Sequence, residues 1–330
     1  MQIRAPIDLE CLVSPIFQKQ TIHTLVCSER ENHFDDLTFN RTAFHPRVPT
    51  ITFHKNIPAA LQNDERFDLA IILTHWVEEV EHLKLARLHQ LAKVYVLWLW
   101  DNHIAEDFHH ALATLADIVF VAHGFNTHYL LNDYSILYGH IPLCSVQWDA
   151  DTAEAVMRES GFQARSNALY GAFFTYKEFP ERHEFLTACA TSAIPNEIRL
   201  RFASEENRSD YFESNKYERL RDWMQHKTSL CLPLHNDLSS RFFDALLAGQ
   251  IPIAPRNIPD LDTVLPPEVQ DWLPVIRFDN YTVDDVSIAY NEAIARFDAD
   301  GPIGVLRRHK FVKENHLARN RFINLFDQLL

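Results

Sequence analysis

The alternation of short apolar runs with helical segments of about a dozen residues constrains this chain more than any other feature. Runs such as "DLAIILTHW" (68–76) and "VYVLWLW" (94–100) have little polar interruption, as expected of strands buried on both faces. The segment 78–92 between them has the apolar spacing of a helix. Strands and helices that alternate in this way form a parallel sheet covered on both faces, so the sequence predicts a doubly wound α/β fold.

The pattern occurs in both halves of the chain and is interrupted over the polar segment 149–167, where we place the interdomain connection. At 330 residues the chain is too long for one ordinary core. We therefore expect two Rossmann-like doubly wound domains facing a cleft, 1–155 and 165–310, and a C-terminal helix at 311–330. The predicted strands are 21–28, 50–54, 68–76, 93–103, 117–123, 168–176, 196–202, 228–234, 250–254 and 273–279; the predicted helices are 78–92, 104–116, 126–133, 180–192, 217–226, 238–248, 284–297 and 303–329.

Charge and cysteine content restrict the class of protein. A formal net charge of −14 argues against a protein that coats nucleic acid, because such binding depends on neutralising phosphates. The five cysteines form no CxxC pair and are typical of buried thiols in a reducing compartment. Acidic residues replace the apolar run of a signal peptide, and 94–100 is too short to span a bilayer. These features predict a cytoplasmic protein; the basic stretch 306–313 is either a peripheral membrane contact or an ordinary charged helix face.

The stretch "HNDLSSRFFDALLAGQIPIAP" (235–255) gathers polar residues at the start of an apolar helix, directly after the predicted strand 228–234. Ligands of doubly wound sheets bind at such strand ends, and the exposed N–H groups of a helix start favour an anion. Ser239 or Asp237 could cap the helix, Arg241 adds a cation suited to phosphate, and Asp244 one turn later could accept both hydroxyls of a ribose. An ordinary helix also begins with a polar cap, so the order of the residues has to distinguish a ligand site from a structural helix start.

That order, S-x-R-x-x-[DE]-A-L-x-x-G-x-x-P, resembles the donor-nucleotide motif of GT-B fold glycosyltransferases. Many members of this family have Glu where this chain has Asp244, and many retaining members have a second acid eight positions upstream, where this chain has Asn236 beside Asp237. The resemblance implies a GT-B-like architecture and a donor site in the C-terminal domain. Its implied donor residues are His235, Asn236, Asp237, Ser239, Ser240, Arg241 and Asp244.

Other segments carry the resemblance further. The stretch "YGAFFTYKEFPERHEFL" (170–186) is similar to the first strand, loop and helix of the GT-B C-terminal domain, which often has a basic residue that contacts phosphate. This similarity implies that Gly171, Lys177 and Arg182 belong to the donor site. The segment 100–130 resembles the acceptor domain, and the last helix matches the family's habit of crossing back to the N-terminal domain.

Catalytic candidates follow the predicted strands of the N-terminal half. Asp101 and His103 follow the run 94–100, and His123 ends the strand 117–123. A carboxylate or imidazole at these positions could remove the proton of an attacking hydroxyl or act as a nucleophile. His75, which follows "DLAIILT" (68–74), is a further candidate, and the sequence leaves open which of these residues is catalytic.

The sequence contains no strong metal or cofactor signature. The groups His75/Glu79/His82 and His103/Asp107/His110 lack HExxH order and a clear third ligand. The D-x-D pairs Asp149/Asp151 and Asp298/Asp300 are typical of GT-A transferases, a fold that the two-domain pattern disfavours. No GxGxxG motif or P-loop is present. We therefore expect no essential metal and no bound cofactor.

The sequence thus predicts a glycosyltransferase that moves a sugar from a UDP-, GDP- or CMP-sugar donor to a hydroxyl of a glycan acceptor, such as a cell-surface polysaccharide. Two other functions stay open: a non-catalytic protein that binds a nucleotide sugar or glycan, and a nucleotide-sugar epimerase. The donor, the acceptor, the oligomeric state and the choice between inversion and retention are also open, since stereochemistry depends on carboxylate placement.

Overall fold

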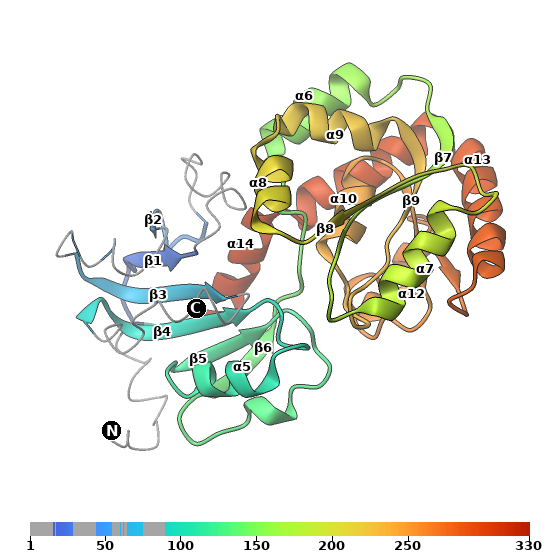
Figure 1. Cartoon of the computed structure of the whole chain (residues 1–330). Coiled ribbons are helices and arrows are strands. Elements are labelled where there is room, and N and C mark those ends of the chain that lie inside the picture. Colours follow the sequence, from blue (N-terminus) through green and yellow to red (C-terminus); the bar gives the residue numbers. More distant parts are fainter. Residues whose placement is uncertain are drawn as a thin grey trace. The chain divides into compact units, whose positions relative to one another are not determined.

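The computed structural model describes residues 16, 18–28, 44–54, 60, 62, 65–74 and 90–330. The chain divides into two compact units, which are described separately (Figure 1). The N-terminal unit comprises Met1–Leu143 together with Ala318–Leu330, and the C-terminal unit comprises Cys144–Leu317. The first 15 residues, His75, Glu79, His82 and positions 78–89 of the predicted helix 78–92 lie outside the described residues; the last residue of that predicted helix, Ala92, belongs to a strand.

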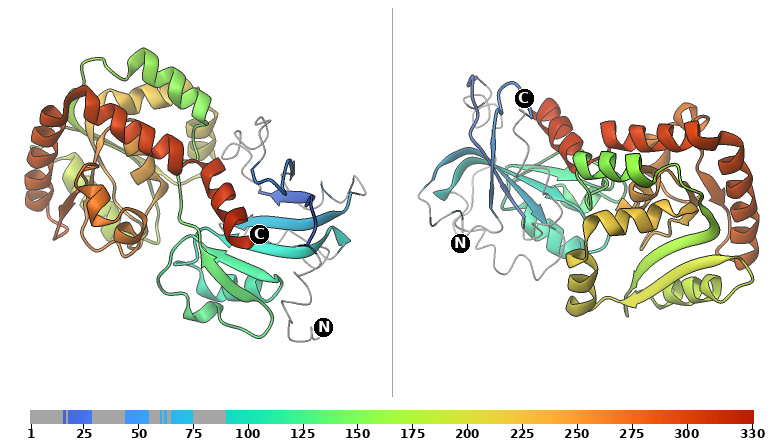
Figure 2. Two further views of the ribbon diagram at one scale, coloured as in Figure 1. Left: turned by 180° about the vertical axis from the view of Figure 1, so that it is seen from behind. Right: turned by 90° about the horizontal axis from the view of Figure 1, so that it is seen from above.

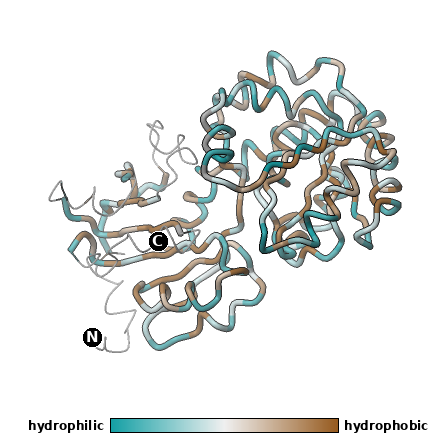
Figure 3. The backbone as a smooth tube through the Cα atoms, in the orientation of Figure 1, coloured by the Kyte–Doolittle hydropathy of each residue, from teal (hydrophilic) through white to brown (hydrophobic). Residues whose placement is uncertain are grey.

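The N-terminal unit contains a six-stranded parallel sheet with the order β2-β1-β3-β4-β5-β6. Its central strand β4 is buried at every position except Lys93, which explains why the sequence there is almost continuously apolar. Figure 3 shows the central strands mostly in the colour of hydrophobic residues. The strands are β1 (Thr24–Cys27), β2 (Ile51–His54), β3 (Phe67–Thr74), β4 (Ala92–Leu99), β5 (Ile118–Val121) and β6 (Ile136–His140); the described helices in 90–143 are α5 (Glu106–Ala113) and the 3-10 turn η3 (His128–Leu130).

The C-terminal unit contains a five-stranded parallel sheet with the order β11-β10-β9-β7-β8 and helices on both faces (Figure 2). Its strands are β7 (Ser166–Thr175), β8 (Asn196–Phe202), β9 (His226–Leu230), β10 (Ile251–Pro255) and β11 (Ile276–Phe278). Its helices are α6 (Ala150–Ser160), α7 (Pro180–Ala190), α8 (Glu205–Glu213), α9 (Lys216–Met224), α10 (Ser240–Leu247), α11 (Leu261–Val264), α12 (Pro267–Gln270) and α13 (Val283–Asn315). Each unit therefore has a Rossmann-like α/β architecture, as the sequence predicts.

The last helix, α14 (Ala318–Leu329), packs on the sheet of the N-terminal unit, although it follows the whole C-terminal unit in sequence (Figure 1). The ring of Phe322 lies edge-on to Trp98 of β4, with 5.7 Å between centroids. The Arg321 guanidinium donates to the carbonyl oxygen of Leu143 at 2.9 Å, and Tyr138 donates to the carbonyl of Gln328. The final helix thus completes the first unit.

Several predicted elements differ from the structure. The polar segment 149–167 contains the helix α6, because Asp149 caps its N-terminus and one narrow face, including Val156 and Met157, is buried. The predicted helix 126–133 is only the 3-10 turn η3, and β6 and α8 were not predicted. The predicted helix 303–329 is interrupted at His316, whose backbone (φ −135°, ψ 27°) is not helical and ends α13. A helix with only a narrow apolar face, or a helix of a single turn, leaves too weak an apolar periodicity to be identified from sequence.

Among the described residues, no helix is both long and apolar enough to cross a membrane.

The buried imidazole of His109 makes the N-terminal unit sensitive to acid. His109 on α5 is 0% exposed, and neither ring nitrogen has a hydrogen-bond partner in the described part of the chain. Burial lowers its pKa from 6.5 to about 4, so the native state binds fewer protons than the unfolded state between these pH values. We therefore expect the free energy of unfolding to decrease, by about 3 kcal/mol at most, as the pH falls from 6.5 toward 4. Urea unfolding at both pH values should show a smaller decrease in the free energy of unfolding for His109→Leu than for the original protein.

The adjacent His110 provides the matched control, because its side chain is exposed on the same helix. The variant His110→Gln should keep the pH dependence of the original protein. Equal pH dependence in His109→Leu and the original protein would contradict the assignment to His109.

Candidate functional site

Polar side chains of the C-terminal unit gather at the carboxyl edge of its sheet. Because all five strands are parallel, the segments that follow β7, β9, β10 and β11 leave from the same edge. Those segments contain Lys177, the loop 231–239, Asn257 and Tyr281. The structure therefore places the stretch 235–241 at the sheet edge where ligands of doubly wound folds bind.

The loop between β9 and α10 is shaped by its own polar residues. The Asp237 carboxylate accepts hydrogen bonds from the backbone N–H of Leu234 at 2.6 Å and of His235 at 3.2 Å. Asn236 has a φ of 60°, a left-handed conformation that Asn tolerates better than most residues, and its side chain accepts a hydrogen bond from Asn257 at 3.0 Å. His235 is exposed at the tip. Asp237 and Asn236 hold the conformation of the loop that leads into α10.

The first turn of α10 has two N–H groups, those of Ser240 and Arg241, with no hydrogen-bond partner among the described residues, whereas the N–H of Phe242 donates to the carbonyl oxygen of Ser239 at 3.1 Å. Ser239 occupies the N-cap position with an extended backbone, but its hydroxyl makes no capping hydrogen bond. Ser240 is the first helical residue, and both serines are half-buried. The helix start therefore combines unbonded amide groups, two hydroxyls and the positive end of a helix dipole, which together suit an anionic group.

Two arginines beside this helix start have different roles. Arg182 donates to the carbonyl oxygens of Phe174, Leu232 and Pro233, so it ties β7 to the segment after β9. Burial, and then the nearby charge of Arg241, lower the pKa of Arg182 to about 10. Its guanidinium is occupied by the fold, which is a structural role that the sequence did not reveal.

Arg241 is the cation that stays available. Its Nε donates to the carbonyl oxygen of Ala172 at 3.0 Å, and its guanidinium carbon lies 4.5 Å from the ring centroid of Phe173. Its two terminal nitrogens have no hydrogen-bond partner among the described residues. Gly171 makes room for this arrangement, since a Cβ there would lie 2.5 Å from the Phe173 ring. Lys177 is exposed, with its ammonium 5.6 Å from the ring centroid of Phe202.

Asp244 lies on α10 but faces the interior of the unit. Its carboxylate accepts hydrogen bonds from the Ser145 hydroxyl and the Gln147 amide, both at 2.7 Å. The side chain is 1% exposed, and burial raises its pKa to about 6. The structure thus brings Ser239, Ser240 and Arg241 together at the helix start and places Asp244 apart from them.

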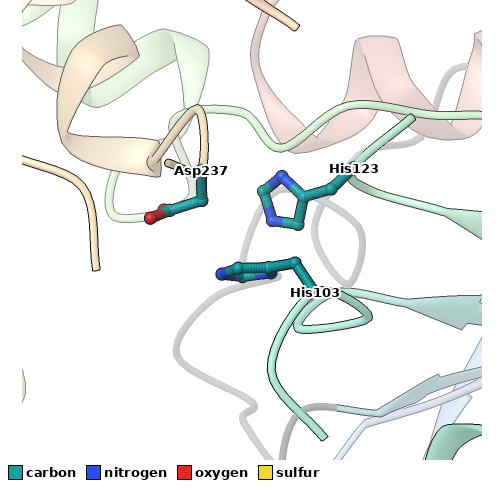
Figure 4. Close-up of side chains that lie close together, drawn as sticks. All are labelled: His103, His123 and Asp237. Carbon is teal, nitrogen blue, oxygen red and sulfur yellow. The ribbon is translucent and has the colours of Figure 1, made fainter. Parts of the chain in front are cut away.

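The N-terminal unit places its candidates at the carboxyl ends of β4 and β5. The rings of His103 and His123 lie 4.1 Å apart between centroids, at 70° to each other, and Figure 4 shows them facing one another. Asn102 supports the pair, because its side-chain amide exchanges two hydrogen bonds of 3.0 Å with the backbone of His123. Asp101 is half-buried at the end of β4. Asp237, also labelled in Figure 4, belongs to the C-terminal unit.

This histidine pair offers an imidazole that could accept a proton from a hydroxyl. The sequence also grouped His103 with Asp107 and His110 as possible metal ligands. In the structure Asp107 and His110 are exposed, and a ring nitrogen of His110 lies 2.5 Å from the carbonyl oxygen of Tyr129. The D-x-D acids also have structural roles: Asp149 caps α6, and Asp300 pairs with the buried Arg308.

Several residues of the site were not predicted from sequence. Asn102 and Asn257 follow strands, so the rule that identified Asp101 and His235 could have found them. Ser145 and Gln147 gave no signal, because they are almost 100 positions from Asp244 in sequence.

No family model matches the chain, and no curated protein matches it in sequence. Among solved structures, an α,α-trehalose-phosphate synthase (UDP-forming) from Burkholderia vietnamiensis matches 93% of this chain and 99% of its own, with 10% identity and a TM-score of 0.52. The chain has the GT-B fold. Starch synthase IV from Arabidopsis thaliana, bound to ADP and acarbose, matches 82% of this chain and 74% of its own at 12% identity, with a TM-score of 0.44. At 10% sequence identity, the match to the trehalose-phosphate synthase shows a shared fold and nothing about the activity of this chain.

Proposed function

We propose that this GT-B protein transfers a sugar from a nucleotide-sugar donor to a hydroxyl of a glycan acceptor. The observation that carries the proposal is the start of α10, where the N–H groups of Ser240 and Arg241 and the two terminal nitrogens of Arg241 have no hydrogen-bond partner in the part of the chain that the structure describes. This combination suits a phosphate group, because backbone N–H groups and a planar guanidinium both donate to phosphate oxygens. UDP-, GDP- and CMP-sugars all carry such a group.

In this proposal, Arg241 and Lys177 contact the donor phosphates and the hydroxyls of Ser239 and Ser240 add hydrogen bonds. Arg182, Asn236, Asp237 and Gly171 shape the site, and His235 lies beside the base or sugar. Cations and a helix start can stabilise the charge that develops on a leaving phosphate, so no metal is needed for that step. Asp101, His103 and His123 are the candidates for receiving the acceptor proton or, for Asp101, for attack on the anomeric carbon.

The stretch 306–313 supports at most a peripheral membrane contact. Leu306, Arg307 and Lys310 are exposed on α13, whereas Arg308, His309 and Val312 are buried. Three of the eight residues of this run are therefore buried, and only one narrow face could touch a cytoplasmic membrane surface.

A thermal-shift panel with UDP, GDP, CMP, CDP, UMP and dTDP, with and without EDTA, tests the proposal. We expect one nucleotide to raise the unfolding midpoint, because a ligand that binds only the native state stabilises it by about 2.7 kcal/mol at 100 times its Kd. EDTA should leave that shift unchanged. A panel without any shift would refute the donor site, and a shift abolished by EDTA would refute the metal-independent form.

A second candidate function is nucleotide-sugar binding without turnover. The start of α10 supports it equally, because contacts to a phosphate would bind a nucleotide sugar whether or not transfer follows. Incubation with the matching nucleotide sugar and glycan fragments separates the functions. Release of free nucleotide with formation of a longer glycan supports transfer, a changed sugar without acceptor supports epimerisation, and binding without product supports the non-catalytic protein.

A further inference from the structure

The helix α10 holds the segment by which the chain enters the C-terminal unit. Both Asp244 oxygens accept hydrogen bonds from that segment, one from the Ser145 hydroxyl and one from the Gln147 amide. Ser145 is 0% exposed and Asp244 is 1% exposed, so water competes little for these bonds. The carboxylate oxygens can accept further hydrogen bonds, but at 1% exposure a ribose hydroxyl could reach them only if the groups that cover Asp244 moved.

The same helix holds the segment by which the chain leaves the unit. Phe243, next to Asp244, stacks on His316 with 5.0 Å between ring centroids and 25° between planes. The backbone N–H of Ser145 donates to the carbonyl oxygen of His316 at 3.0 Å, and Ser145 forms a parallel bridge with Leu317. We call Cys144–Trp148 and His316–Leu317 the connecting segments. They lie side by side, and both are attached to α10 through adjacent residues.

We infer that Asp244 is a positioning residue that ties α10 to the two connecting segments, rather than a ligand of the donor ribose. Because the first turn of α10 is the proposed phosphate site, nucleotide binding there should slow the opening of the connecting segments, and this part rests on the proposed function. The high pKa of Asp244, raised to about 6 by burial, agrees with a carboxylate enclosed by protein groups.

The first test asks whether the Asp244 carboxylate accepts hydrogen bonds from the ribose hydroxyls. The preferred ribonucleotide and its 2′,3′-dideoxy analogue are titrated into the original protein and into Asp244→Asn. An Asn side chain can accept from Gln147 while donating to the Ser145 hydroxyl, so the variant keeps the attachment. We expect the ratio of the two Kd values to agree within about twofold between the proteins. A ratio that collapses by tenfold or more in Asp244→Asn would overturn the inference, since it would show direct recognition of the ribose hydroxyls.

The second test measures the attachment by amide hydrogen exchange in the connecting segments. We expect exchange at Ser145 to be at least tenfold faster in Asp244→Ala, near the original rate in Asp244→Asn, and unchanged in the control Asp262→Ala, whose exposed carboxylate pairs with Arg277. Saturating nucleotide should slow this exchange in the original protein and have little effect in Asp244→Ala. If Asp244→Ala does not fold, Gln147→Leu removes one of the two bonds and should give a smaller increase.

The outcomes separate the inference from the proposed function. An unchanged exchange rate in Asp244→Ala, or in Gln147→Leu where it is the variant used, would refute the attachment whatever the nucleotide result. A protein that binds none of the nucleotides refutes the proposed function, whereas the exchange rates without nucleotide still decide the attachment.

Discussion

Replacement of Arg241 by Ala should weaken binding of the preferred nucleotide by about 100-fold. Two terminal nitrogens of Arg241 have no partner among the described residues, and each charge-assisted hydrogen bond to phosphate contributes about 1.5–3 kcal/mol. Isothermal titration gives the two Kd values directly. Without nucleotide, the variant should lose only about 1 kcal/mol of stability, since it gives up one bond to Ala172 and the contact with Phe173.

Two further variants control this experiment. Arg158→Ala removes an arginine of the same unit whose side chain is 77% exposed, and it should leave the Kd unchanged. Arg241→Lys keeps the charge but loses the planar fork, and should give an intermediate Kd. An Arg241→Ala variant that binds within twofold of the original protein would mean that the phosphate site lies elsewhere.

Replacement of Asp300 by Ala should cost about 3–5 kcal/mol, because it leaves a buried arginine without its carboxylate partner. Arg308 is 0% exposed, and its terminal nitrogen donates to Asp300 at 2.9 Å while Nε donates to the carbonyl of Gly249. Burial lowers the pKa of Arg308 to about 10 despite this partner. Thermal unfolding should show a midpoint about 10 °C lower, as expected for a loss of this size in a unit of this length.

Asp298 provides the matched control two residues earlier. Its side chain is 54% exposed and pairs with Lys227 at 2.7 Å, so Asp298→Ala should cost no more than about 1 kcal/mol. Equal losses in the two variants would show that the burial of the Arg308 pair is not the cause. If a divalent metal raised the midpoint of thermal unfolding of the original protein but not of either variant, the D-x-D motif Asp298/Asp300 would instead be a metal site.

Local patterns predicted much of the fold. The apolar runs that became β3, β4 and β5 are recognisable because strands buried on both faces need apolar residues at consecutive positions. The helix start at Ser239 was predictable for a similar reason, since the N-cap preference acts over a few residues. Helix α6 was missed because its buried face is narrow, and the break at His316 because packing against Phe243 helps to hold it.

The sequence by itself determined the parallel α/β class and the polar residues at the start of α10, and it predicted the sheet edge at which we propose the donor site. These properties depend on periodicity and on the order of neighbouring residues, which a sequence displays directly. Only the tertiary structure decided the role of each side chain there. Arg182 and Arg241 are the same residue type at the same edge, but Arg182 donates to three backbone carbonyls. Arg241 donates to one carbonyl through Nε, and its terminal nitrogens have no hydrogen-bond partner among the described residues. Asp244 likewise received its role from Ser145 and Gln147, since hydrogen-bond partners that distant in sequence are set by packing.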